Sequence, residues 1–275
     1  MRISKSVTTA QSDVNEYFHE RAAYWTSIYE RDGVAERVHQ ERLRATLSLV
    51  ETLGLAKDAR VLDMGCGAGF ATVAIARRQL SVEACDSVAA MVEATRKRAL
   101  DAGLDARVAV GTADINAIPF PDAHFDLVVC LGVLPWLANV EKPLDELSRV
   151  LKPGGHLIVT NDTNWQLRQL FDPLYNPILR RPREIVGRFL GRPRGVRSRT
   201  MTAGAFRAAL SRHGLDELRG ATLGFGPFTL FKREVLPASV GVKLNDWLQS
   251  QANAGAPLIR SLGSQYLALA QKRSA

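Results

Sequence analysis

A run of closely spaced glycines near residue 65 has the pattern of a turn that binds a nucleotide-like ligand. Gly65, Gly67 and Gly69 stand at alternate positions directly after a short segment, 60–64, that reads as a strand. Glycine lets the backbone turn tightly, and a ligand can lie against it because no Cβ is in the way. The helix expected next offers unpaired N–H groups at its start. The pattern therefore predicts a binding turn between a strand and a helix.

The spacing of this turn excludes two common nucleotide sites. The dinucleotide pattern G-x-G-x-x-G requires a glycine or alanine at its last position, where this chain has Phe70 or Thr72, depending on the starting glycine. A P-loop is excluded as well, since no G-K-S or G-K-T follows. The strand ends instead with an acid, Asp63, two residues before the first glycine. A carboxylate there would repel a pyrophosphate and would suit a cationic amino-acid ligand.

Two further acids follow later predicted strands. Asp86 ends the segment Val82–Asp86, and Asp114 lies in the run Gly111–Ile115. Together with the D-x-G-x-G-x-G pattern that begins at Asp63, these two acids make the chain resemble the class I S-adenosylmethionine-dependent methyltransferases. It is most similar to the branch of ubiquinone and menaquinone biosynthesis, with close resemblance over residues 35–161.

The resemblance implies a role for each of these positions in the expected cofactor site. The glycine turn would hold the methionine part, Asp86 would accept both ribose hydroxyls, and Asp114 would accept from the adenine amino group. Thr112 stands where the family often has aspartate, a departure that leaves the adenine position intact. The residues expected to bind S-adenosylmethionine are Asp63, Gly65, Cys66, Gly67, Gly69, Asp86, Ser87, Met91, Asp114, Ile115 and Leu131.

The elements that must position these residues alternate between short apolar strands and helices. Fully apolar strands such as 127–131 indicate a parallel sheet covered on both faces. The expected fold is α/β, a doubly wound, Rossmann-like, mostly parallel sheet of seven strands. We expect helices over 13–31, 34–53, 70–78, 89–102, 140–151, 203–212 and 240–252, and strands over 60–64, 81–85, 107–110, 125–131, 156–161, 217–223 and 266–271.

The predicted helices and strands divide the chain into four segments. Residues 1–34 are expected to form a tail and a cleft-closing helix, 35–161 the cofactor-binding core, 162–201 a basic insertion or lid, and 202–275 the C-terminal part of the core sheet. Residues 1–12 are polar and expected to fray, and 152–155 are expected to form a turn into the fifth strand. Aromatic residues of the N-terminal helices and the loop after the fourth strand are candidate pocket walls, namely Tyr17, Tyr24, Trp25 and Trp136.

The net charge of +8 is concentrated in one segment, Arg180 to Arg199, which holds eight arginines and one acid, Glu184. Its mixture of basic and apolar residues is typical of an interfacial segment that contacts a membrane. Arginines also recognise phosphates and carboxylates of small ligands. The other interpretations are that the segment binds nucleic acid, that it binds a protein partner, or that it is a solvated loop without a ligand. With membrane contact and a small anionic ligand, these make five interpretations, and all of them stay open.

The expected function is methyl transfer from S-adenosylmethionine to a small-molecule or lipid-like acceptor, most readily at oxygen, by in-line displacement. A base is needed only for a hydroxyl or carbon-acid acceptor, and the candidates are His19, His39 and Asp162. The segment Leu131–Trp136 replaces a histidine-bearing segment common in relatives. The alternatives are an RNA methyltransferase that uses Arg180 to Arg199 on phosphates and a non-catalytic protein that binds the cofactor.

Composition sets the remaining expectations. The 275 residues are 46% hydrophobic and 23% charged, as in globular proteins, and are enough to bury a core without a metal or disulfide. The three cysteines, Cys66, Cys85 and Cys130, lack C-x-x-C spacing, which argues against a zinc site and a disulfide framework. No signal peptide or membrane span is evident. We therefore expect a cytoplasmic protein with no metal. If the arginine-rich segment is interfacial, we also expect peripheral contact with a membrane.

Overall fold

The computed structural model describes residues 5–167, 169, 172–176 and 198–274. Its helices are α1 (Lys5–Glu20), α2 (Ala22–Ser27), α3 (Val34–Thr52), α4 (Phe70–Ala76), α5 (Ala89–Asp101), α6 (Glu141–Val150), α9 (Ala203–Arg212) and α10 (Ala238–Asn253), with short 3-10 turns η1 (Leu134–Trp136) and η2 (Ile259–Ser261). Its strands are β1 (Arg60–Met64), β2 (Ser81–Asp86), β3 (Val108–Thr112), β4 (Phe125–Cys130), β5 (Leu151–Asp162), β6 (Leu215–Leu223), β7 (Thr229–Leu230), β8 (Arg233–Glu234) and β9 (Gln265–Lys272).

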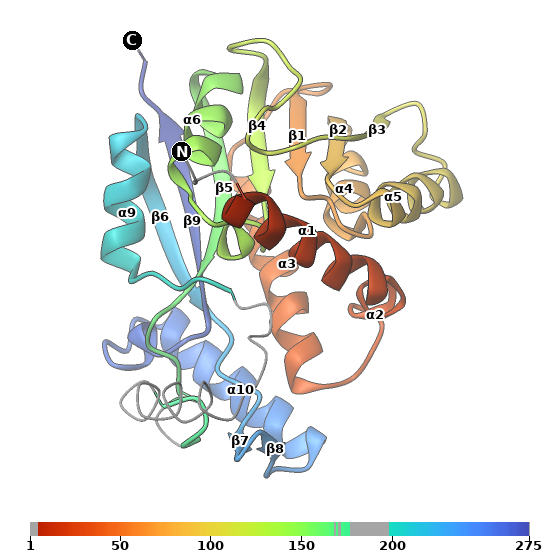
Figure 1. Cartoon of the computed structure of the whole chain (residues 1–275). Helices are drawn as coiled ribbons and strands as arrows, with labels where there is room; N and C mark the ends of the chain where they lie inside the picture. The colour runs from red at the N-terminus through yellow and green to blue at the C-terminus, as the bar shows by residue number, and fades with distance from the viewer. Residues whose placement is uncertain (1–4, 168, 170–171, 177–197, 275) are drawn as a thin grey trace.

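Seven of these strands form one sheet in the order β3-β2-β1-β4-β5-β9-β6 (Figure 1). Strands β1 to β5 pair in parallel, and β9 runs antiparallel to both of its neighbours. Each parallel pair is joined by a connection that contains a helix, as parallel pairing requires. The expected doubly wound, mostly parallel, seven-stranded fold is confirmed. The strands β1 to β5 therefore end on the same side of the sheet, which we call the carboxyl edge.

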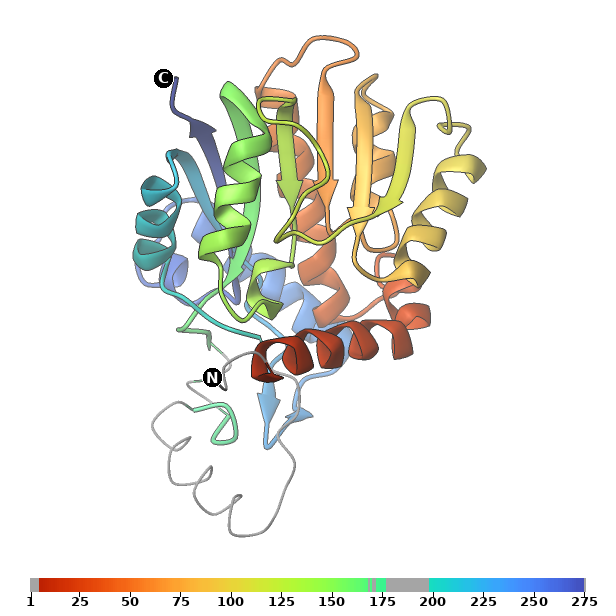
Figure 2. The ribbon, with the colours of Figure 1, turned by 45° about the horizontal axis from the view of Figure 1, so that its top comes forward.

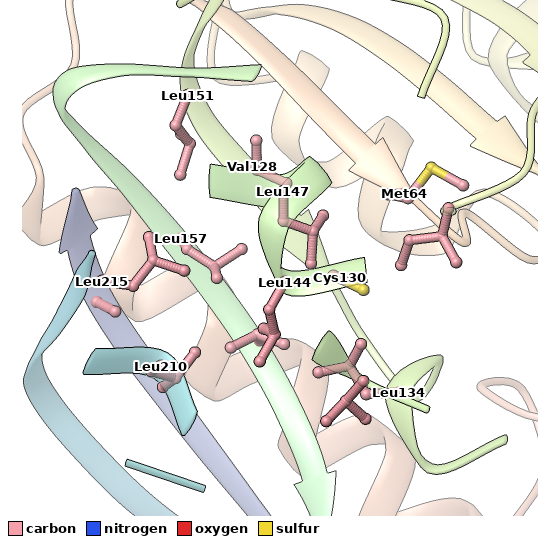
Figure 3. Close-up of a cluster of buried hydrophobic side chains, with 14 of the residues drawn as sticks. Met64, Val128, Cys130, Leu134, Leu144, Leu147, Leu151, Leu157, Leu210 and Leu215 are labelled. Atoms are coloured by element: carbon pink, nitrogen blue, oxygen red, sulfur yellow. The ribbon is translucent and has the colours of Figure 1, made fainter. Parts of the chain in front are cut away.

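Alternate residues of the central strands pack into two cores on opposite faces of the sheet. In β4, Val128 and Cys130 pack with the buried side chains of α6 and α9, whereas Leu127 and Val129 pack on the face that α3, α4 and α5 cover. Figure 3 shows the first of these cores, in which Leu144 and Leu147 of α6 lie over β4 and β5. This two-residue period follows from the pleat of a strand, and it buries both faces of β4.

The N-terminal region differs from the sequence prediction. The expected single helix over 13–31 is wrong, because the chain turns at Arg21 between α1 and α2. Residues 5–12 belong to α1, and the expected fraying of residues 1–12 stays a prediction. The aromatic residues on the two sides of the break still pack together, because the Phe18 and Trp25 rings lie 5.4 Å apart. Tyr17 also stacks on Trp136, and Trp25 packs edge-on against His39.

The segment 152–155 also differs from the prediction, because it lies inside β5 and not in a turn before it. Phe125 pairs with Leu151 and Leu127 with His156, so β5 carries extra residues between two ladder positions. Gly154, at φ 75°, adopts the left-handed conformation within this bulge. The strand therefore begins five residues earlier than the apolar run that follows it.

The apolar residues of α3 are buried only in part. Val38 and Val50 are buried, whereas Leu43, Ala45, Leu47 and Leu49 are partly buried. The buried residues recur at every fourth position, and they are Val34, Val38, Arg42, Thr46 and Val50. Two of these five are polar, and one of them carries a charge.

Among the helices of the described ranges, none combines the length and the apolarity that crossing a membrane requires.

The packing of α6 on the sheet leads to a stability prediction. Leu147 is fully buried between α6 and the sheet, so Leu147→Ala removes methyl groups and leaves a cavity. We expect a loss of about 2–5 kcal/mol in the free energy of unfolding, measured by urea denaturation. Leu100 on α5 is 63% exposed and is the matched control, for which Leu100→Ala should change the free energy by less than about 0.5 kcal/mol. Equal losses in the two variants would contradict this core.

Candidate functional site

The glycine-rich turn joins β1 to α4 at the carboxyl edge. The N–H groups of Gly65 and Cys66 donate to the carbonyl of Cys85 at 2.7 and 3.0 Å, which fastens the turn to β2. Gly65 and Gly67 have φ values of 81° and 54°, in the left-handed region that other residues rarely adopt. A Cβ on Gly65 would meet Val133 at 2.1 Å, whereas a Cβ on Gly67 would have no atom within 4 Å. The backbone at Gly67 is therefore open on the side where a ligand could lie.

Asp86 lies beside this turn at the end of β2. Its Oδ2 accepts from the Gly67 N–H at 3.0 Å, and its Oδ1 accepts from the Val88 N–H at 2.9 Å. Burial raises the pKa of Asp86, while the N–H groups of Val88 and Gly67 act to lower it. Each carboxylate oxygen has a further lone pair, so Asp86 can still accept from hydroxyl groups of a ligand.

Asp63 lies deeper, beneath the turn, and is 2% exposed. Its Oδ2 accepts from the Thr72 hydroxyl, on the first turn of α4, at 2.6 Å. Burial raises the pKa of Asp63 to about 6, the Thr72 hydrogen bond opposes this, and the nearby Asp86 adds to it. A cationic group near the turn would favour the ionised form of Asp63. The structure thus places Asp63 as a buried acid with one neutral partner.

The residues expected at the adenine end lie past β3 and at the start of α5. Asp114 is exposed, and its Oδ1 accepts from the backbone N–H and the side-chain amide of Asn116 at 2.9 and 2.8 Å. Ile115 and Met91 are buried. The Ser87 hydroxyl is exposed and donates to Oδ1 of Asn15 at 3.3 Å, which links α1 to the loop after β2.

The other predicted cofactor residues line the turn. Cys66 is buried, and its Sγ lies 3.4 Å from the Thr95 hydroxyl. Burial raises the pKa of the Cys66 thiol, so it is not a reactive thiolate. Leu131, directly after β4, is half-buried. All three cysteines are buried and none forms a disulfide.

Helix α1 lies across the carboxyl edge (Figure 2). Tyr17 stacks on Trp136 of η1 with ring centroids 5.6 Å apart, and Phe18 packs edge-on against the same ring at 5.2 Å. Arg98 of α5 donates to the carbonyl of Ala68 and to that of Thr26, at 2.8 and 3.2 Å. These contacts join α1 to η1 and, through Arg98, join α2 to the glycine-rich turn.

The three candidate bases come from separate elements. His19 is exposed on α1, and Asp162 ends β5. His39 lies on α3, and burial together with the Arg42 charge lowers its pKa to about 3. Its Nδ1 is buried and has no hydrogen-bond partner among the described residues. His39 is therefore uncharged at neutral pH, and which of the three lies next to an acceptor stays a prediction.

Most of the arginine-rich segment, residues 180–197, lies outside the described residues. Arg199 is described, and its backbone N–H donates to the carbonyl of Pro135 at 2.6 Å. Its guanidinium donates to the carbonyl of Ala138. The chain therefore returns from that segment next to η1, at the covered side of the site.

Several residues of the site were not expected from the sequence. Thr72 and Thr95 contact Asp63 and Cys66, and both are fully buried. Arg42, 8% exposed, packs against Gly132. The signal for Arg42 was present, because a row of α3 residues at four-residue spacing is apolar at Val34, Val38 and Val50. A charge in such a row is unusual and marks a candidate functional residue.

A surface hollow of about 480 Å³ lies away from the glycine-rich turn. Residues of β6, α9 and η2 contribute to its lining, including Gly220, Arg207 and Arg260. Its lining also includes Thr163, directly after the carboxyl end of β5, and Tyr266 of β9, so it lies toward the β9–β6 end of the sheet order. The turn and the three acids are a stronger candidate site, because they combine an open glycine backbone, the two buried carboxylates of Asp63 and Asp86, and a helix across the carboxyl edge. In the described ranges, no group of three His, Cys, Asp or Glu side chains is arranged to hold a metal ion.

Comparisons with known proteins agree with this geometry. Residues 62–159 match the family model described as "Methyltransferase domain". The ubiquinone/menaquinone biosynthesis C-methyltransferase UbiE of Psychromonas ingrahamii is 31% identical over 164 residues, which cover 58% of this chain and 60% of that protein. The chain spans less than two thirds of the length of the curated relatives it matches.

Solved structures share the fold over almost the whole chain. The magnesium protoporphyrin IX methyltransferase of Synechocystis PCC 6803 with bound SAH has a TM-score of 0.65 at 16% identity, covering 95% of this chain and 99% of that one. The geranyl diphosphate C-methyltransferase of Streptomyces coelicolor A3(2) has a TM-score of 0.62 at 16% identity, covering 96% and 98%. At this level of identity the likeness shows a common fold.

The buried acid leads to a prediction about pH. Folding raises the pKa of the Asp63 carboxyl from 3.8 to about 6. Between these two pH values the carboxyl is mostly protonated in the folded chain and mostly ionised in the unfolded chain. This contribution to the free energy of unfolding is fully present below about pH 4 and is lost as the pH rises through 6. Asp63→Asn stays neutral and still accepts from Thr72, so it should lack this loss of up to about 3 kcal/mol.

Urea denaturation of both proteins between pH 4 and pH 7.5 measures the difference. Asp122→Asn is the control, since Asp122 is an exposed acid on the loop before β4. If the wild type and Asp63→Asn change equally with pH, Asp63 does not carry a raised pKa.

Proposed function

We propose that the chain is a class I S-adenosylmethionine-dependent methyltransferase that transfers a methyl group to a small-molecule or lipid-like acceptor. The match of residues 62–159 to the methyltransferase domain model and the similarity to UbiE support this proposal. The observation that carries the proposal is the meeting of the open glycine turn with the Asp86 carboxylate, whose oxygen lies 3.0 Å from the Gly67 nitrogen. A ligand lying over Gly67 would meet backbone on one side and a carboxylate on the other.

The residues present fit S-adenosylmethionine. No atom lies within 4 Å of a Cβ built on Gly67, so the turn leaves space for a ligand. Under this proposal the turn Gly65–Gly69, with Cys66 and the buried charge of Asp63, receives the methionine part. Asp86 and Ser87 receive the ribose, and Asp114 and Ile115 receive the adenine, with Met91 and Leu131 as apolar walls.

The chemistry follows from placement. S-adenosylmethionine supplies an activated methyl group that leaves a neutral thioether behind. The protein has to hold the acceptor in line behind the methyl carbon, and positioning of this kind contributes several kcal/mol. Helix α1, held by the Tyr17–Trp136 stack, excludes water from the reacting groups. No metal is required for such a step.

We propose oxygen as the atom that is methylated, with a hydroxyl that is already acidic. His39 is uncharged at neutral pH but binds a proton weakly, since its pKa is about 3. His39 is therefore better suited to orient a hydroxyl by a hydrogen bond than to remove the proton of an alcohol. A phenol or an enol, whose proton leaves near pH 10 or below, needs less help. His19 and Asp162 are alternative bases under the same proposal.

Carbon is the second candidate, and the relatives support it, because UbiE of Psychromonas ingrahamii is named a C-methyltransferase. RNA is a weaker candidate acceptor. The described arginine of the basic segment, Arg199, already donates to Ala138, which leaves its guanidinium less free for a phosphate. A cytoplasmic location, with peripheral membrane contact through Arg180 to Arg199, and a lid formed by 162–201 belong to the same proposal.

The cofactor is tested by calorimetric titration of S-adenosylmethionine. Asp86→Ala should weaken binding by about 10- to 100-fold, because a charged hydrogen-bond acceptor for two hydroxyls is lost. Asp58→Ala is the control, since Asp58 is exposed and lies before β1, at the opposite edge of the sheet. Circular dichroism checks that both variants fold. A wild type that does not bind, or an Asp86→Ala variant that binds equally well, would contradict the proposal.

The methylated atom is tested by incubating the wild type with methyl-labelled S-adenosylmethionine and a set of phenols and hydroquinones. Oxygen transfer should give a product whose methyl carbon resonates in the methoxy range of the NMR spectrum, whereas carbon transfer gives an aryl methyl signal. RNA as acceptor would instead give label in polynucleotide, with a rate that falls steeply with salt. A carbon-bound methyl group as the main product would overturn the choice of oxygen.

A further inference from the structure

The short hairpin β7–β8 has a turn that its residues do not favour. Leu230 pairs with Arg233, so Phe231 and Lys232 form a two-residue turn between the strands. Both turn residues lie in the left-handed region, at φ values of 51° and 64°. Such a turn normally carries Asn-Gly or Asp-Gly, and a bulky residue at positive φ is unusual. Strained residues persist only where the surrounding structure holds them, and they cluster at functional positions.

A buried carboxylate holds this turn from its inner side. Asp172 is fully buried and accepts from the backbone N–H groups of Phe231 and Lys232 at 3.1 and 2.8 Å. It also accepts from the Thr229 hydroxyl at 2.7 Å and from the Leu174 N–H at 2.8 Å. Four donors therefore fix one carboxylate, and the carboxylate fixes the turn. The strained conformation is thus preformed, and the two turn side chains are left at the surface.

The side chains around this turn are apolar and exposed. Phe231 is 59% exposed, and Leu230 and Val235, which flank the turn, are exposed as well. On α10, which follows the hairpin directly, Val240 and Trp247 are exposed seven residues apart and so share one face of the helix. These five are half of the ten large hydrophobic side chains exposed in the described ranges, yet they fall within 18 residues. Clustering of this kind marks an interaction surface.

Cations accompany these apolar side chains. Lys232 lies in the turn, Arg233 follows it, and Lys243 is exposed on α10. Residues 229–243 contain these three cations and one acid, Glu234, and so carry a net charge of +2. Exposed aromatic and aliphatic side chains flanked by cations are typical of a segment that lies at the surface of an anionic bilayer.

The hairpin projects beyond the sheet. In both Figure 1 and Figure 2 it lies past the carboxyl edge, next to one end of α10. The proposed cofactor site lies at the same edge. A bilayer in contact with the hairpin would therefore face that edge of the sheet.

We propose that the β7–β8 hairpin and the exposed face of α10 dock on an anionic lipid bilayer, with Phe231 inserted at the level of the acyl chains. This surface is separate from Arg180 to Arg199, and docking needs neither cofactor nor methyl transfer. A turn that is already rigid loses little conformational entropy on binding. Nucleic acid is a weaker candidate, because Leu230 and Val235 offer no aromatic face for base stacking.

The experiment is co-sedimentation of the full chain with vesicles of phosphatidylcholine alone and of an equimolar mixture of phosphatidylcholine and phosphatidylglycerol. The test variant combines Phe231→Asn with Lys232→Gly, which gives the turn its favoured residues and removes the apolar ring and the charge. Leu100→Asn is the matched control, since Leu100 is an exposed leucine on α5. Phe231→Trp keeps an apolar ring and adds a fluorescent reporter.

We expect the wild type to bind the anionic vesicles about tenfold more tightly than the neutral ones, and less tightly at high salt. The double variant should lose at least tenfold in binding to anionic vesicles, because the inserted ring is gone. Its midpoint of thermal unfolding should not fall, since the turn strain is relieved. Leu100→Asn should bind like the wild type. Phe231→Trp should bind as well, and its additional emission should shift to the blue when vesicles are added.

Three outcomes would overturn the proposal. The first is a wild type that binds neither vesicle, and the second is a double variant that binds as tightly as the wild type. The third is a different occupant. Self-association without lipid, or binding to transfer RNA, that the double variant abolishes would assign the hairpin to a second copy of the chain or to nucleic acid. None of these results bears on the cofactor, which the titration with S-adenosylmethionine tests separately.

Discussion

The hydrogen bond from the Gly67 N–H to the Asp86 carboxylate is the contact on which the geometry of the candidate site depends. It joins the turn after β1 to the end of β2, which the parallel register brings side by side. The turn is also held by the Cys85 carbonyl, so its backbone has little freedom. A ligand that binds here meets donors and acceptors that are already in position, and it does not have to order a loop.

The site combines buried charges of both signs. Asp63 and Asp86 lie below and beside the turn, and Arg42 lies past β4. Burial of such groups costs stability unless a partner compensates them. Thr72 and backbone N–H groups compensate the acids, whereas Arg42 has only the hydroxyl of Tyr29 within the described residues. Among these buried charges, the arginine is therefore the least compensated within the described residues.

Much of this arrangement could be predicted from the sequence. The apolar strands and the acids at their ends fixed the order β1, β2, β3 and the positions of Asp63, Asp86 and Asp114, because these depend on local pattern and chain order. The break at Arg21 was not predicted, because the aromatic spacing continues across it and Phe18 still contacts Trp25. The bulge in β5 depends instead on pairing with β4. Thr72 and Arg42 were missed for the same reason, because their partners are far away in the chain.

Helix α1 has a consequence for the order of events in turnover. Its aromatic residues stack on η1, and Asn15 is hydrogen-bonded to Ser87, so it bridges the two sides of the carboxyl edge. Under the proposed function, a nucleoside bound beneath α1 would require these contacts to open before it could leave. Release of the product, more than the chemical step, would then limit the rate of turnover.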